Sequence, residues 1–116
     1  MQHAKQKRTL GRTRSQRTAL LRGLAISLFE HGSIVTSTAK AKELQPFAER
    51  LVTYGKQGTV AARRNAATKL GEPNTQVVSK LFDEIAPKYA DRSGGYTRII
   101  KMGIKDGRDQ SVIELV

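Results

Sequence analysis

The sequence predicts an α+β domain in which a small mixed or antiparallel sheet, made of one short strand and a C-terminal hairpin, packs on about four helices. Apolar residues recur at helical spacing over most of residues 15–87, and after Gly95 they alternate with a period of two. With 116 residues, the chain has the length of one domain. We therefore expect a basic N-terminal arm over residues 1–14 and a single α+β domain over residues 15–116.

The first helix is expected to begin near Ser15, whose hydroxyl can cap it, and to end at Gly32. Its apolar stripe consists of Leu20, Leu21, Leu24, Ala25 and Leu28. The next segment, Ser33–Ser37, is rich in β-branched residues, which predicts a short strand.

A second helix follows, with Thr38 as its expected N-cap, and Gly55 and Gly58 are expected to bound the loop after it. Its apolar positions are Leu44, Phe47, Ala48, Leu51 and Val52. Residues 59–70 predict a short third helix with a basic face.

A fourth helix is expected to start at Asn74 or Thr75 and to end at Pro87. Alternation from Gly95 predicts a strand in which Tyr96 and Arg98 share a face. The turn signal Asp106-Gly107 then leads to a partner strand over residues 110–116.

The charge of the chain is strongly positive. Twenty-one Lys and Arg against 10 Asp and Glu give a formal charge of +11, which indicates a polyanionic partner, either nucleic acid or an anionic membrane. Seven basic residues precede the first acidic residue, Glu30. Residues 1–14 have too few apolar side chains to form a core, so they are a solvated end, an arm that folds on nucleic acid, or a transit peptide.

The sequence lacks the residues that several classes of protein require. The chain has no cysteine, and its longest apolar stretch, Ala19 to Phe29, contains Arg22 and is too short to span a bilayer. Ser37 and Lys40 match the S-x-x-K nucleophile motif, but its companion motifs are missing and a helix cap explains the same residues. We expect neither an enzyme nor a metal or cofactor site.

Three basic groups could contact phosphates: the arm, the pair Arg63 and Arg64, and residues 91–98. In the last, Gly94 and Gly95 allow close backbone approach, and Arg92 and Arg98 can bind phosphate oxygens. Tyr96 either stacks on RNA or belongs to the core. Because the arm has no aromatic residue and no helix-turn-helix, zinc-finger or RRM motif is visible, we expect packed RNA helices as the partner.

A colinear set of motifs resembles the bacterial large-subunit ribosomal protein family numbered seventeen. The set consists of Met1-Gln2-His3, Leu10-Gly11-Arg12, Arg17, Lys40-Ala41-Lys42-Glu43-Leu44, Arg63-Arg64, Lys80-Leu81-Phe82, Ser93-Gly94-Gly95-Tyr96-Thr97-Arg98-Ile99 with Lys101 and Gly103, and Ile113-Glu114-Leu115. The resemblance covers nearly the whole chain.

The resemblance implies a structural constituent of the large ribosomal subunit, with an arm that stays in the mature protein. It also implies a place near the polypeptide exit tunnel and neighbours of the twenty-second and thirty-second families, in a cytoplasmic or an organellar ribosome. The candidate rRNA-binding residues are His3, Lys5, Lys7, Arg8, Arg12, Arg14, Arg17, Arg22, Arg63, Arg64, Arg92, Gly94, Gly95, Tyr96 and Arg98. The alternatives are a free-standing RNA- or DNA-binding regulator and a small hydrolase that uses Ser37 and Lys40.

Overall fold

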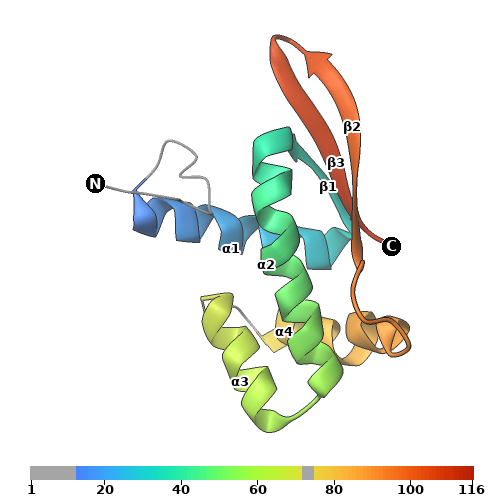
Figure 1. Ribbon diagram of the computed structural model, residues 1–116. Coiled ribbons are helices and arrows are strands. Elements are labelled where there is room, and N and C mark those ends of the chain that lie inside the picture. The colour runs from blue at the N-terminus through green and yellow to red at the C-terminus, as the bar shows by residue number, and fades with distance from the viewer. Residues whose placement is uncertain (1–12, 72–74) are drawn as a thin grey trace, which may run out of the picture.

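The computed structural model describes residues 13–71 and 75–116, and it confirms an α+β fold (Figure 1). The elements are α1 (Arg14–His31), β1 (Ser33–Ser37), α2 (Thr38–Gln57), α3 (Val60–Lys69), α4 (Thr75–Lys80), a π-helical turn (Leu81–Ile85), a 3₁₀ turn (Ala86–Tyr89), β2 (Thr97–Lys105) and β3 (Arg108–Leu115). No helix in these two ranges is long and apolar enough to cross a membrane.

The sheet is antiparallel throughout, which settles the choice between a mixed and an antiparallel sheet. Its strand order is β1-β3-β2, so the last strand of the chain lies in the middle. The pairing of β1 with β3 stops at Ser37 and Gln110, whereas β2 pairs with β3 as far as Arg108. The β2–β3 hairpin therefore projects past β1 and away from the helices, as Figure 1 shows.

The core lies between the sheet and the helices. Its largest fully buried side chains come from α1, α2, the segment after α4 and β3, and include Phe29, Leu44, Leu51, Leu81 and Ile113. In β3 the inward positions alternate with outward ones, as the period of two predicts. Within residues 13–71 and 75–116, the helices thus cover one face of the sheet, and no helix covers the other face (Figure 1).

Two helices begin earlier than predicted. The N-cap of α1 is Thr13, not Ser15, and Thr13 and Gln16 form a reciprocal capping box. The N-cap of α2 is Ser37, not Thr38. Thr38 is buried, and its hydroxyl lies 2.7 Å from the hydroxyl of Ser111 in the sheet.

Two predicted helix ends are also wrong. Gly55 lies inside α2, where a Cβ would come within 2.7 Å of the Ala86 side chain, so the absence of a side chain lets two segments pack closely. Pro87 does not end the helical segment, because it lies at the start of the 3₁₀ turn. The predicted cap at Asn74 lies outside the described residues, and α4 begins at Thr75.

The hairpin boundaries differ from the prediction by about two residues. The first strand starts at Thr97, after the positive φ of Gly95, and its partner starts at Arg108, directly after the turn. β1 spans residues 33–37 as predicted.

Candidate nucleic-acid interface

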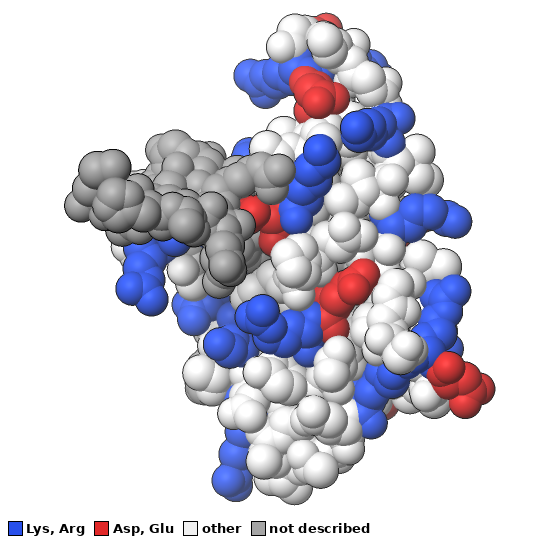
Figure 2. Space-filling model, in the orientation of Figure 1, with Lys and Arg blue, Asp and Glu red and all other residues white. Residues whose placement is uncertain are grey.

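Among the charged side chains on the visible surface, positive ones are more widespread than negative ones (Figure 2). Figure 2 shows Lys and Arg over this face from the hairpin to the helices at the opposite end, with Asp and Glu in fewer places. Of the candidate residues, His3, Lys5, Lys7, Arg8 and Arg12 lie outside the described residues. The structure separates the other candidates into side chains with partners inside the domain and side chains that face solvent.

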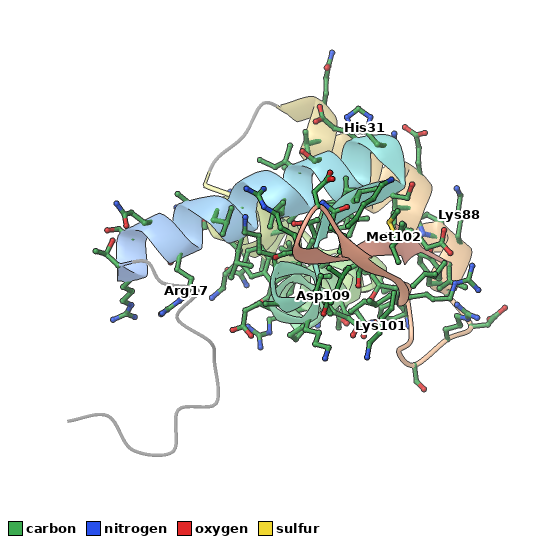
Figure 3. All side chains as sticks on the ribbon, turned by 90° about the horizontal axis from the view of Figure 1, so that it is seen from above. Arg17, His31, Lys88, Lys101, Met102 and Asp109 are labelled. Atoms are coloured by element: carbon green, nitrogen blue, oxygen red, sulfur yellow. The ribbon has the colours of Figure 1, made fainter. Side chains whose placement is uncertain are left out.

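The start of α1 carries Arg14 and Arg17 in its first turns. Arg14 is exposed and Arg17 is partly exposed, and the first turn contains no acidic residue. Figure 3 places Arg17 near the beginning of α1 and His31 at its opposite end. Since the N-terminus of a helix carries a partial positive charge, arginines there do not stabilise the helix. They do add positive charge at this end of α1, which follows the basic residues of the arm in the sequence.

The Arg22 side chain forms hydrogen bonds within the domain. Its Nε donates to the carbonyl of Lys69 at 3.0 Å, and its Nη2 donates to the carbonyl of Thr68 at 3.4 Å. These carbonyls belong to the last turn of α3, where a cation is favourable. Arg22 therefore joins α1 to the end of α3.

Arg63 has partners within the domain, whereas its neighbour Arg64 faces solvent. Arg63 donates to the hydroxyl of Ser79 at 2.9 Å, lies 3.9 Å from an Asp83 carboxylate oxygen, and stacks 5.3 Å above the ring of Phe82. Arg63 thereby joins α3 to the segment around α4. Arg64 points to solvent and keeps its charge available.

In residues 91–98 the structure places Tyr96 in the core. Tyr96 is 3% exposed, and its ring centroid lies 5.2 Å from that of Tyr89. Lys56 Nζ lies 2.9 Å from the Tyr96 hydroxyl and also donates to the carbonyl of Arg92. Lys56 was not a candidate in the sequence, and only its position four residues after Val52 on the apolar stripe of α2 could have indicated it.

Arg92 and the two glycines shape the same loop. Arg92 donates to the carbonyl of Gly95 at 3.2 Å and stacks 5.9 Å from the Tyr89 ring. Gly94 and Gly95 have φ of 147° and 67°, which favours glycine, and no described atom lies within 4 Å of a Cβ added at either position. Burial raises the pKa of Tyr89, and the Arg92 guanidinium partly opposes this increase.

Arg98 does not share a face with Tyr96, so that prediction is wrong. Tyr96 and Thr97 are both buried, so the alternation of inward and outward side chains begins only where β2 starts at Thr97 and does not include Tyr96. Arg98 is on the helix-free face, where its Nε donates to Glu114 Oε1 at 2.8 Å across the β2–β3 pair. Its side chain remains 59% exposed.

Ser37, which was considered as a nucleophile, has a structural role. The Ser37 hydroxyl accepts a hydrogen bond from the backbone N–H of Lys40 at 3.3 Å, as a helix cap does. His31 is exposed in the last turn of α1. Within residues 13–71 and 75–116, no group of three or more His, Asp or Glu side chains could hold a metal ion.

Residues 20–116 match the family model described as ribosomal protein L17. A protein of Desulfitobacterium hafniense strain DCB-2, named large ribosomal subunit protein bL17, is 55% identical over 94% of this chain and 97% of its own length. A protein of the same name from Fusobacterium nucleatum is 49% identical over the full length of both chains. The bL17 of Geobacter metallireducens is 51% identical, and this chain spans 65% of its length.

Proposed function

This chain belongs to the ribosomal protein L17 family, and from that premise we propose that it binds large-subunit rRNA through its basic arm and the adjoining start of α1. The family is a structural component of the large ribosomal subunit and not an enzyme. The chain therefore has a structural role in translation. The residues that contact rRNA are the subject of the proposal.

The observation that carries the proposal is the position of Arg14 and Arg17. Both lie at the positive end of α1, where no acidic residue of the first turn neutralises them. Phosphate groups near a helix N-terminus would gain from both the arginines and the helix dipole. Arg64 is a further solvent-facing candidate on α3, whereas Arg22, Arg63, Arg92 and Arg98 already have partners within the domain.

The family resemblance also suggests where in the large subunit the chain lies. We propose a position near the polypeptide exit tunnel of a cytoplasmic ribosome, with neighbours from the twenty-second and thirty-second large-subunit families. The helix-free face of the sheet supports a protein neighbour, because Val35, Val112 and Ile100 form one row across the three strands. Val35 is 58% exposed and Ile100 is 45% exposed, an arrangement that suits contact with protein better than contact with phosphate.

Sedimentation distinguishes a subunit constituent from a free-standing regulator. The tagged chain is expressed in a bacterium, and the lysate is separated on a sucrose gradient after a wash at moderate salt. We expect the chain to co-migrate with the large subunit. Recovery in the light fractions alone would support the regulator and contradict the proposal.

Deleting residues 2–12 tests the arm and leaves the Thr13 cap of α1 in place. The deletion removes Lys5, Lys7, Arg8 and Arg12. If all four contact phosphate, the slope of log K against log salt for rRNA binding should flatten by roughly 2.8–3.6. A variant with these four residues changed to Gln controls for chain length and should flatten the slope equally. An unchanged slope in both variants would show that the arm is a solvated end.

A further inference from the structure

Two further basic residues, Lys40 and Arg108, help to line a hollow at the opposite end of α2 from α3. The hollow has a volume of about 400 Å³ and is lined by Thr36, Ser37, Lys40, Arg108 and Gln110. It forms where β1 ends and the β2–β3 hairpin continues beyond it, so three elements contribute to its walls. The site could not be predicted from sequence patterns, because Lys40 and Arg108 lie far apart in the chain.

The chemistry of the lining suits an anion. Two side chains are cations, the other three carry a hydroxyl or an amide that can donate a hydrogen bond, and none is a carboxylate or a hydrocarbon side chain. A pocket for a small organic molecule is mostly apolar, so this hollow does not resemble one. Among the described residues, the side chains of Lys40 and Arg108 take part in no ion pair.

The hairpin itself adds a second, independent indication. Lys105 and Arg108 are direct cross-strand partners, and like charges in such a pair are destabilising. Asp106 and Asp109 are the nearest acidic residues in the chain, but neither lines the hollow, and within the described residues neither forms an ion pair with Lys105 or Arg108. An anion bound beside Arg108 would relieve this repulsion.

We propose that this hollow binds a phosphate of the RNA backbone, held by Lys40 and Arg108. The inference rests on the proposed function, since it takes rRNA as the ligand. It adds a contact at the hairpin to the one proposed at the start of α1. The guanidinium of Arg108 can bind two phosphate oxygens in parallel, and Lys40 supplies a compact second charge.

Amine labelling tests the contact directly. The full chain is acetylated with a water-soluble ester, alone and bound to protein-free large-subunit rRNA, and modification is read by mass spectrometry. Lys42 is the matched control, because two helical residues place it about 200° around α2 from Lys40. We expect rRNA to suppress labelling of Lys40 and to leave Lys42 reactive. Equal labelling of Lys40 with and without rRNA would overturn the inference.

A pair of charge variants provides the second measurement. The double variant Lys40→Gln with Arg108→Gln should flatten the salt slope of rRNA binding by roughly 1.4–1.8, the value for two phosphate contacts. The control, Lys42→Gln with Lys88→Gln, removes the same charge from exposed positions outside the hollow and should leave the slope unchanged. Equal slopes for both double variants would contradict the site.

The same experiments keep the two proposals distinct. If the unmodified chain showed no affinity for large-subunit rRNA, the proposed function itself would fail. If the chain bound rRNA with Lys40 unprotected, only the site at the hollow would fail. Protection of Lys40 in the assembled subunit but not by rRNA alone would assign the hollow to an acidic protein partner and overturn the RNA contact.

Discussion

Gly55 allows a sharp test of the packing that supports the basic surface. It is buried in α2 and faces Ala86, and a Cβ at this position would lie 2.7 Å from the Ala86 Cβ and 3.4 Å from the carbonyl oxygen of Leu81. The change Gly55→Ala therefore forces α2 and the 3₁₀ turn apart. Gly23→Ala in α1 is the matched control, because beyond the adjoining helix backbone no atom of the described residues lies within 4 Å of a Cβ at Gly23.

The expected magnitude comes from two opposing contributions. Replacing a helical glycine by alanine stabilises a protein by roughly 0.5–1 kcal/mol. Overpacking a close contact destabilises by about 1–3 kcal/mol. Gly23→Ala gains only the first contribution, so it should raise the free energy of unfolding. Gly55→Ala has both, so it should lower that free energy by up to about 2.5 kcal/mol.

Urea unfolding followed by far-ultraviolet circular dichroism measures both variants. The dependence on urea should stay the same, so the midpoints report stability directly. The two variants should differ by about 1–3 kcal/mol, which is the overpacking contribution alone. If Gly55→Ala stabilised the protein as much as Gly23→Ala does, the close approach of α2 to the 3₁₀ turn would be refuted.

Three further predictions concern contacts that the sequence did not specify. Arg98→Ala should lower the free energy of unfolding by no more than about 1 kcal/mol, because the pair with Glu114 is partly exposed; a double-mutant cycle with Glu114→Gln measures the coupling, and zero coupling would contradict a stabilising pair. Ser111→Ala should destabilise by about 1–3 kcal/mol, because it leaves the buried Thr38 hydroxyl without its partner. Adding Thr38→Val should recover part of that loss in urea unfolding, and strictly additive losses would count against the hydrogen bond. Burial raises the pKa of Tyr89 above its usual 10.0. As the pH rises, the Tyr89 hydroxyl therefore ionises in the unfolded chain before it ionises in the folded one. The stability that the neutral hydroxyl contributes is complete below pH 10.0 and should be lost above it. Melting temperatures on both sides of that pH should fall less steeply for Tyr89→Phe than for the unchanged chain, and equal slopes would refute this cause.

Local signals in the sequence predicted the positions of most elements. Gly32 ends α1 with a φ of 83°, and the β-branched segment after it forms β1 as expected. The helix starts were harder to predict, because Ser15, Ser37 and Thr38 carry equivalent capping hydroxyls. At α2, Ser37 is the N-cap because the Thr38 hydroxyl is instead hydrogen-bonded to Ser111, which lies near the C-terminal end of the chain. A partner so distant leaves no local pattern.

Contacts between residues distant in the sequence also explain why the candidate interface could be predicted only in part. Composition identified the basic residues, but it could not tell which of them have partners within the fold. Arg22 reaches carbonyls 46 and 47 residues away, and Lys56 holds Tyr96 across 40 residues. The hollow at Lys40 and Arg108 also depends on tertiary structure, because it exists only where the hairpin projects past β1.

A density map of a bacterial large subunit assembled with this chain would show directly what the start of α1 contacts. We predict that it lies against rRNA, with the guanidinium groups of Arg14 and Arg17 about 2.7–2.9 Å from phosphate oxygens. A map in which the chain occupies the subunit while this end of α1 faces solvent or protein would contradict the proposed interface.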